Sequence, residues 1–518
     1  MNKLPIIDLF AGPGGLGEGF SALRINSLSA FKIVLSIEKD PYAHKTLQLR
    51  SFYRQFICRN KEVPPEYYDY LEGEITRKEL FSLYKSEAQS AEDESWLCEL
   101  GSEKYPNNLI YNRIRMALRG NKDFVLIGGP PCQAYSLVGR SRMIGGQRNA
   151  NNGDISKFEQ DHRHILYRQY LRIIAEHSPA VFVMENVKGI LSSKLDDKPI
   201  FPEIIKDLKE PWQAATRYDY GKGYQKSGYR ILSFATGKEP DDYRDFMIKS
   251  EQYGIPQARH RVILLGIRED IYDKRKSNIT ALKKKDSLSL KNVLGDIPAL
   301  RSGISKDKDS CDRWSEVLAE AVKEKWFKEL DSMVEKEIGV ILDSIKQNPI
   351  KERINKKKYK ANISGWFKDE CLRCLPNHST RSHMKTDLHR YLFASIFAKV
   401  NEESPDLSDF PLSLLPNHKN VMEGVEGKTF GDRFKVQVWH LPSTTVTSHI
   451  AKDGHYFIHP DPLQCRSLTV REAARLQTFP DNYYFEGNRT QQYHQVGNAV
   501  PPLLAYQLSE VVHNILRG

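Results

Sequence analysis

The chain contains little cysteine and has no long apolar run. Its 518 residues include seven cysteines, an odd number spread thinly along the sequence, which excludes a disulfide-stapled scaffold of the secreted type. There is no apolar stretch of about 20 residues, the length that a transmembrane helix needs. The N-terminal residues lead directly into a predicted strand and lack the apolar core of a signal peptide. We therefore expect a cytoplasmic protein with no membrane partner.

Acidic residues are outnumbered by basic ones. The sequence has 66 Asp and Glu against 77 Lys and Arg, which gives a formal net charge of +11 at pH 7. A basic surface suits a polyanionic partner, because Lys and Arg release counterions when they bind phosphates. Many basic soluble proteins have no such partner, so charge alone does not identify the ligand. The length allows two to four domains of average size.

Five short apolar runs in the first half of the chain predict buried strands. Helical patterns such as Ile165–Glu176 lie between several of them, and residues 42–123 form a long polar, helix-like insertion after the second run. This alternation predicts a mostly parallel α/β sheet with right-handed crossovers, which binds ligands beyond the carboxyl ends of its strands. The predicted strands are Pro5–Asp8, Lys32–Ile37, Phe124–Ile127, Ala180–Met184 and Arg261–Gly266.

The character of the chain changes from about residue 270. Basic clusters occur at Lys274–Lys276 and Lys283–Lys285, and one or two long helices are predicted over Asp312–Asn348. Residues 405–460 are rich in Pro, Gly and His and predict loops or short strands. Helical periodicity returns at Leu503–Leu516, which predicts an amphipathic helix.

The most informative segment is Gly128–Leu137, which has the sequence GGPPCQAYSL and follows the predicted strand Phe124–Ile127. Glycines let a backbone approach a ligand closely, and consecutive prolines stiffen the chain and remove two N–H donors. A cysteine in such a turn, Cys132, is positioned for chemistry rather than for packing. For this segment on its own, the alternative is a small buried side chain in a turn.

Five further blocks surround this segment in a fixed order. They are Asp8–Gly15 (DLFAGPGG), Met184–Val187 (MENV), Gln257–Arg261 (QARHR), Arg471–Pro480 (REAARLQTFP) and Gln495–Pro501 (QVGNAVP). In this order the blocks strongly resemble the cytosine-C5 DNA methyltransferases of the bacterial restriction–modification type. The resemblance covers about residues 4–268 and 442–510.

The resemblance implies a Rossmann-like, S-adenosylmethionine-dependent methyltransferase domain of the α/β class with a separate target-recognition domain. By resemblance, residues 1–293 form the first part of the catalytic domain and residues 294–485 form the recognition domain. Residues 486–518 are then a segment that returns to the catalytic domain.

The resemblance assigns the turn after the first strand to the cofactor, S-adenosylmethionine. From the residues alone, a glycine-rich turn permits a close ligand, and a carboxylate after the second strand, Glu38, can accept hydrogen bonds from ribose hydroxyls. A solvated strand end is the alternative for Glu38. By resemblance, Phe10 packs on the adenine, and Glu74 is the candidate for an acid at the adenine edge. The other cofactor residues implied are Ala11, Gly12, Gly14, Pro130, Leu166, Asn498 and Val500.

The resemblance also implies how the target base is held. Carbon 5 of cytosine is a poor nucleophile until a thiolate adds at carbon 6, and Cys132 is the expected nucleophile. Glu185 follows a predicted strand, where its carboxyl can bond N3 and the exocyclic amine together; a solvated or salt-bridged strand end is the alternative. Arg261 is expected at the O2 side of the base, while Arg259 either contacts phosphate or steadies the cysteine loop. The base must leave the duplex to reach these groups.

Duplex DNA is the expected partner, and polar or basic residues are expected to contact it. Cys371, Cys374, His378 and His383 are possible zinc ligands within 13 residues, but they are crowded and lack a second pair, so no metal is expected. The predicted DNA-contacting residues are Gln133, Ser136, Lys356, Lys357, Lys358, Arg381, His383 and Arg390.

Two other interpretations of the chain are an RNA methyltransferase and a non-enzymatic DNA-binding homologue. The transfer-RNA enzyme that shares these blocks lacks a large recognition region, whereas this chain has about 190 residues there. A non-enzymatic homologue should have lost Cys132, Glu185 or the glycine turn, and all three are present. We therefore predict a monomeric DNA (cytosine-5-)-methyltransferase, paired in function with a restriction endonuclease without a required complex.

Overall fold

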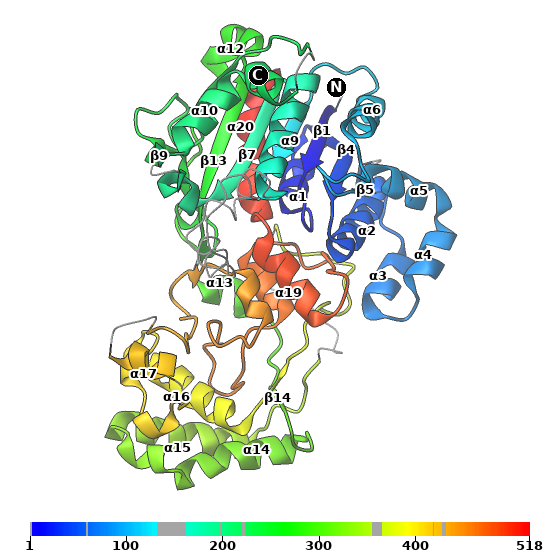
Figure 1. Ribbon diagram of the computed structural model, residues 1–518. Coiled ribbons are helices and arrows are strands. Elements are labelled where there is room, and N and C mark those ends of the chain that lie inside the picture. The colour runs from blue at the N-terminus through cyan, green and yellow to red at the C-terminus, as the bar shows by residue number, and fades with distance from the viewer. Residues whose placement is uncertain are drawn as a thin grey trace.

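The computed structural model in Figure 1 describes residues 3–58, 61–131, 162–195, 198–219, 223–354, 365–417, 419–426 and 431–518. A twisted sheet with helices on both faces makes up one end of the molecule, and a helical unit makes up the other. Helix α19 (Arg489–Asn498) lies between them. Both ends of the chain lie at the sheet end, away from the helical unit.

The central sheet confirms the predicted α/β architecture. Its strands run in the order β10-β13-β7-β6-β1-β4-β5, and β11 pairs with the start of β13. Neighbouring strands are parallel except at β13, which runs antiparallel to β7, β10 and β11. The chain crosses over in both directions from the central β1, which leaves a crevice at the carboxyl ends of the strands. The bounds are β1 (Leu4–Leu9), β4 (Phe31–Glu38), β5 (Ser95–Leu97), β6 (Val125–Gly128), β7 (Val181–Val187), β10 (Tyr229–Ser233), β11 (Met247–Lys249) and β13 (His260–Arg268).

Alternate residues of each buried strand belong to two separate apolar cores. In β6, Leu126 lies in one core while Val125 and Ile127 lie in the other, because successive side chains of a strand point to opposite faces. Helices α6, α9 and α10 cover the first core, and α1 and α20 cover the second. The predicted C-terminal helix thus packs on the sheet. The helices around the sheet are α1 (Gly15–Ala22), α6 (Asn107–Leu118), α9 (His162–His177), α10 (Phe201–Lys209), α11 (Pro211–Tyr218), α12 (Glu269–Arg275) and α20 (Pro502–Arg517).

The predicted insertion after the second strand is helical, and it also contains a strand that the sequence analysis missed. Four helices follow β4 before the chain returns as β5, an edge strand of three residues. Asp40 caps α2 by accepting backbone N–H groups, and Thr76 forms a capping box with Glu79 at the start of α4. The four helices are α2 (Pro41–Ile57), α3 (Pro65–Glu72), α4 (Arg77–Leu83) and α5 (Lys85–Glu94).

The helical unit has its own apolar core, in which Trp314 and Tyr391 are fully buried. The helical pattern over Asp312–Asn348 forms two helices, α14 and α15, separated by short 3-10 turns, and α15 ends just before Pro349. The bounds in this unit are α14 (Cys311–Ala319), α15 (Ser332–Gln347), α16 (Lys385–Asn401), α17 (Lys419–Val425), β14 (Gly303–Ile304) and β15 (Ser382–His383).

A third group of helices joins the sheet to the helical unit. Helices α13, α18 and α19 share one apolar cluster with Phe367 and Val446, so segments far apart in the chain meet there. Among the residues described, no helix is long and apolar enough to cross a membrane. The remaining elements are α13 (Leu290–Leu294), α18 (Val470–Leu476), β12 (Gln257–Ala258) paired with β16 (Ser443–Thr444), β2 (Arg24–Ile25) paired with β3 (Leu28–Ser29), and β8 (Lys194–Leu195) paired with β9 (Lys198–Pro199).

Asp8, in the central strand β1, makes the stability of the sheet depend on pH. Its side chain is buried, and neither carboxyl oxygen has a hydrogen-bond partner in the described part of the chain. Burial raises the pKa of Asp8 to about 8, against the opposing effect of Arg54. The pKa is ordinary in the unfolded chain, so the folded protein holds an extra proton between about pH 4 and about pH 8.

We predict that the free energy of unfolding, measured by urea titration, falls by a few kcal/mol as the pH rises from about 5 to about 8. The stability contributed by protonated Asp8 is complete below its unfolded pKa and is lost as the pH passes its folded pKa. The isosteric Asp8→Asn variant should show a flatter dependence. Equal slopes in the variant and the wild type would exclude Asp8 as the titrating group.

Candidate active site

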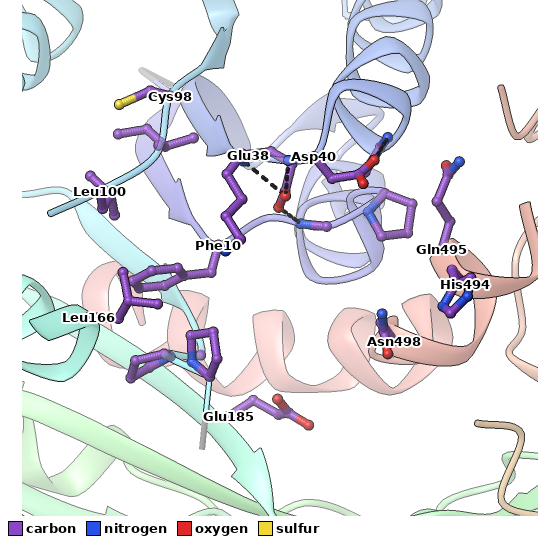
Figure 2. Close-up of a pocket in the computed structure, with 18 of the residues that line it drawn as sticks. Phe10, Glu38, Asp40, Cys98, Leu100, Leu166, Glu185, His494, Gln495 and Asn498 are labelled. Carbon is purple, nitrogen blue, oxygen red and sulfur yellow. Dashed lines mark hydrogen bonds between the residues drawn. The ribbon is translucent and has the colours of Figure 1, made fainter. Parts of the chain in front are cut away.

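A cavity of about 610 Å³ lies where the carboxyl ends of β1, β4, β6 and β7 meet α19. Figure 2 shows Phe10 and Leu166 together on one side of it, His494 and Asn498 of α19 on the other, and Glu185 at the edge nearest β7. The α19 residues recur every three or four positions and so share one face of the helix. The crevice expected from the sheet topology therefore combines residues from both ends of the chain.

The turn after β1 is fastened to the end of β4. The backbone N–H of Gly12 donates to Glu38 Oε2 at 2.7 Å, while Glu38 Oε1 accepts the backbone N–H groups of Lys39 at 2.9 Å and Asp40 at 2.7 Å. Burial raises the pKa of Glu38, and these three hydrogen bonds oppose that rise. The carboxyl group is thus held in one orientation at the cavity wall, and it retains lone pairs for hydroxyl donors.

The cavity fits S-adenosylmethionine in size and in chemistry. Its volume is in the range of small-molecule sites. Phe10, Leu100 and Leu166 supply apolar surface suited to an adenine ring, and Glu38 supplies acceptors suited to ribose hydroxyls. The predicted cofactor residues that line the cavity are Phe10, Gly12, Glu38, Pro130, Leu166 and Asn498.

Two predicted cofactor residues lie elsewhere. Glu74 is in an exposed turn between α3 and α4, outside the cavity lining. The prediction is wrong because four helices separate β4 from β5, so that Cys98 and Leu100, just after β5, line the cavity instead. Val500 is buried in the core between α1 and α20. The cavity lining also includes Gln491, His494 and Gln495. These residues lie seven, four and three positions before Asn498, so they share one helix face with it, and the sequence spacing could have indicated them.

Ala11 and Gly14 support the turn rather than line the cavity. The backbone N–H of Ala11 donates to the Ile37 carbonyl at 3.1 Å. Gly14 has a φ of 96°, and a Cβ added there would lie 2.8 Å from a methyl carbon of Leu47 and 2.9 Å from the Tyr483 hydroxyl. The absence of a side chain at Gly14 therefore serves the packing of the turn.

The predicted catalytic carboxyl group and one predicted arginine meet at the cavity edge. Glu185 lies in β7 and Arg261 in the antiparallel β13, and Arg261 Nε is 2.8 Å from Glu185 Oε1. Their side chains are only 18% and 13% exposed, so water screens this ion pair incompletely. The next residue, Asn186, donates through Nδ2 to the Pro130 carbonyl at 3.1 Å. Two neighbouring residues of the MENV block therefore have separate contacts: Glu185 pairs with Arg261, and Asn186 holds the turn that precedes Cys132.

Arg259 does not reach the surface. Its side chain is 2% exposed and donates to the Val446 carbonyl at 2.7 Å and to the Gly497 carbonyl at 3.2 Å. Burial lowers the pKa of Arg259 well below its ordinary value, with a further lowering from Arg261. This burial excludes one of the two expected roles, a phosphate contact, because the arginine ties the start of β13 to two distant backbone segments. The other expected role, support of the cysteine loop, stays a prediction.

Two groups of predicted residues lie outside the described part of the chain. Cys132, Gln133 and Ser136 fall within residues 132–161, and Lys356, Lys357 and Lys358 fall within residues 355–364. Pro131, which immediately precedes Cys132, is described and lines the cavity.

Three predicted DNA contacts have internal partners instead. His383 is 4% exposed, and burial lowers its pKa well below the ordinary value, so the ring is neutral near pH 7. Arg390 is buried and lies 2.8 Å from Asp387. Arg381 is half-buried and donates to the Ile450 carbonyl at 2.8 Å. The sequence shows that these side chains are polar or basic, but not which groups of the fold they contact.

The possible zinc ligands do not converge. Cys371 is exposed, whereas His378 is buried and bonds the Thr469 hydroxyl and the Pro298 carbonyl through its two ring nitrogens. Within the described ranges, no group of three or more His, Cys, Asp or Glu side chains could hold a metal ion.

The chain is similar to DNA methyltransferases over most of its length. Residues 116–211 and 246–514 match the family model for C-5 cytosine-specific DNA methylases. The chain is 34% identical to the type II methyltransferase M.Bpa9945I of Bacillus paralicheniformis, over 99% of both proteins. It is 25% identical to the type II methyltransferase M.DdeI of Desulfomicrobium norvegicum, over 98% of this chain and 87% of that protein. Among solved structures, the Entamoeba histolytica methyltransferase EhMeth matches with a TM-score of 0.41 and 13% identity, over 100% of both chains.

The chain therefore belongs to the C-5 cytosine-specific DNA methylase family. It is a DNA (cytosine-5-)-methyltransferase with DNA as its substrate and S-adenosylmethionine as its methyl donor, as the motif blocks predict.

Gly14 offers a test of how the glycine turn is built. Gly14→Ala should lower the free energy of unfolding by about 2–4 kcal/mol, because it combines a left-handed backbone with two close contacts. Gly73→Ala is the matched control: its φ is 81°, but a Cβ there meets nothing within 4 Å, so about 1 kcal/mol is expected. Urea unfolding compares them, and equal losses would contradict the packing role of Gly14.

Glu185 and Glu38 are two carboxyl groups of one cavity with different expected roles. Glu185→Gln should lower single-turnover methylation by about 100- to 10,000-fold, the usual contribution of an acid–base group, with the cofactor affinity nearly unchanged. Glu38→Gln should mainly weaken S-adenosylmethionine binding in calorimetry. A near-normal rate for Glu185→Gln, accompanied by a lower melting temperature, would make Glu185 a structural residue.

Proposed function

We propose that the enzyme methylates cytosine within one specific duplex DNA sequence and protects the DNA of a bacterial cell from a restriction endonuclease of the same specificity. The support is the likeness to type II methyltransferases, one of which aligns over 99% of both chains. The enzyme works in the cytoplasm as a monomer, and protection needs no complex with the endonuclease. Residues 294–485 read the sequence, while residues 1–293 and 486–518 carry the catalytic groups.

The observation that carries the proposed chemistry is the Glu185–Arg261 pair at the edge of the cavity. Glu185 bonds N3 and the exocyclic amine of a flipped cytosine, which distinguishes cytosine from thymine. Arg261 holds the carboxyl group of Glu185 and lies at the O2 side of the base. The acidic and basic groups thus compensate the charge that develops in the ring when a nucleophile adds.

Cys132 supplies that nucleophile. Its thiolate forms a bond to carbon 6, and Glu185 provides a proton to N3, so that carbon 5 becomes electron-rich. S-adenosylmethionine supplies the methyl group when it is bound. A base then accepts the proton from carbon 5, the bond between carbon 6 and sulfur breaks so that Cys132 leaves as a thiolate, and N3 returns its proton to Glu185, which restores the aromatic ring.

The test is a duplex that contains 5-fluorocytosine at the target position. Fluorine cannot leave carbon 5 as a proton does, so the wild-type enzyme and S-adenosylmethionine should form a stable covalent adduct, seen as a shifted band on a denaturing gel. Cys132→Ala should abolish the adduct and retain DNA binding. Survival of the adduct in Cys132→Ala would contradict the assignment.

Cys98→Ala is the matched control. Cys98 also lines the cavity, but burial raises the pKa of its thiol to about 12, so it is not a thiolate at neutral pH. At saturating S-adenosylmethionine the adduct should still form in this variant, because a change in the cavity lining can lower cofactor affinity but leaves the nucleophile Cys132 in place. Transfer RNA offered in place of duplex DNA should remain unmodified, and single-base methylation sequencing of DNA from an expressing host should show one modified motif. Methylation without sequence preference would contradict the proposed protective role.

A further inference from the structure

We propose that helices α2, α3 and α4 form a brace that sets the position of the recognition region relative to the cofactor turn, with Asp369 as the positioning residue. This inference rests on the proposed function, because it takes residues 294–485 to read the DNA. The family model does not match the insertion that supplies α3 and α4, so its role must be argued from its contacts.

The first contact of the brace is with residues 365–375. Asp369 Oδ2 accepts the Tyr68 hydroxyl at 2.9 Å and Asn482 Nδ2 at 2.5 Å. Leu372 and Leu375 are buried against apolar side chains of α2, α3 and α4. Asp369 is half-buried, but its two donors, Tyr68 and Asn482, are buried. An acceptor shared by two buried donors fixes one relative position of the segments that supply them, because losing the acceptor leaves both polar groups unsatisfied.

Charged residues reinforce this contact at its edge. Arg373 lies 2.5 Å from Asp69 and 2.8 Å from Glu72, both in α3. The Arg373 side chain is 49% exposed, so these ion pairs contribute little to affinity between the segments. The contact of Asp369 with the buried side chains of Tyr68 and Asn482 is therefore the stronger polar contact of the two.

The second contact is with the segment before α19. Glu486 Oε1 accepts the Tyr70 hydroxyl at 2.6 Å and Arg77 Nη1 at 2.5 Å. Two residues later, Asn488 caps α19, the helix that carries His494 and Asn498 at the cavity. The brace thus touches the recognition region on one side and the cavity helix on the other.

A line of hydrogen bonds, buried except at Asp369, connects Asp369 to the cofactor turn. Arg50 of α2 donates to both carboxyl oxygens of Glu18, at 2.9 Å and 2.5 Å, and to Asn482 Oδ1 at 3.0 Å. Asn482 donates in turn to Asp369. Glu18 is in α1, the helix that begins directly after the glycine turn. Arg50 and Glu18 are both buried, so a change of position would leave charges unpaired in a poorly solvated place.

The Asp369 contact affects how tightly the enzyme binds DNA, because it determines what fraction of the molecules has the recognition region in the correct position. If the Asp369 contact is lost, the recognition region occupies several positions, and only the fraction in the correct one binds DNA productively. The apparent DNA affinity falls by that fraction, while molecules that have bound DNA react at the normal rate. A positioning role therefore predicts a higher KM for DNA with little change in kcat.

The test compares Asp369→Ala with Glu370→Ala in the full-length enzyme. Glu370 is the adjacent residue with the same charge, its side chain is 71% exposed, and it forms an ion pair with Lys368 in the same segment. Asp369→Ala should raise the Kd and KM for the target duplex about tenfold. Its kcat and its Kd for S-adenosylmethionine should stay within about twofold of wild type, and Glu370→Ala should match wild type throughout.

Tyr68→Phe supplies an independent check. It removes one donor to Asp369 without creating a charge, so it should give a smaller rise in the KM for DNA. Combined with Asp369→Ala it should add almost nothing, because the two changes break one shared contact. Strict additivity would overturn the assignment of Asp369 as the shared acceptor.

Two results would overturn the brace itself. One is an unchanged KM for DNA in Asp369→Ala. The other is a loss of activity in Asp369→Ala that equals the loss of folded protein, while the folded molecules keep a normal kcat and a normal KM for DNA. In that case Asp369 would contribute only to stability. Failure of the proposed function would look different, since it would appear in the wild-type enzyme as methylation without sequence preference.

Discussion

The close packing of the first helix against the last is the constraint on which the site depends. A Cβ on Gly15 would lie 2.2 Å from the Val500 carbonyl oxygen, and one on Gly19 would lie 2.3 Å from that of Pro502. Helix α1 therefore touches the start of α20 directly. Because α19 ends at Asn498, just before this contact, the packing brings Asn498 to the wall opposite Glu38. The cavity is closed by two segments from opposite ends of the chain.

Buried arginines hold the region between the sheet and the helical unit. Arg466 pairs with Glu472 through two contacts of 2.7 Å, and Arg475 pairs with Asp481 at 2.8 Å and 2.7 Å. Burial tends to raise the pKa of Glu472, but Arg466 lowers it well below its usual range. Each arginine satisfies fixed partners in one geometry, so the REAARLQTFP block acts as an internal joint rather than as a DNA-contacting surface.

The same use of charge explains why the predicted DNA contacts were the weakest part of the sequence analysis. Arg259, Arg390 and His383 look available in the sequence, yet in the fold they contact backbone carbonyls, the carboxyl group of Asp387 and the hydroxyl of Ser467, respectively. Glu74 fails for a different reason: it was predicted by resemblance from its local sequence, whereas the chain reaches the cavity again only after β5, a strand of three residues that the sequence does not reveal. Both errors concern contacts between segments distant in the chain.

The sequence by itself determined five strands of the eight-stranded sheet, the caps of several helices, the glycine turn and the types of catalytic side chain, and with them the family. These features depend on neighbouring residues: strand patterns on alternation, caps on side chains within one turn. Only the tertiary structure decided that Cys98 and His494 line the cavity, that Arg259 is internal and that Asp369 meets Tyr68. Residues 68 and 369 are 301 positions apart, and no local pattern encodes a contact that exists only once both segments have packed on α2.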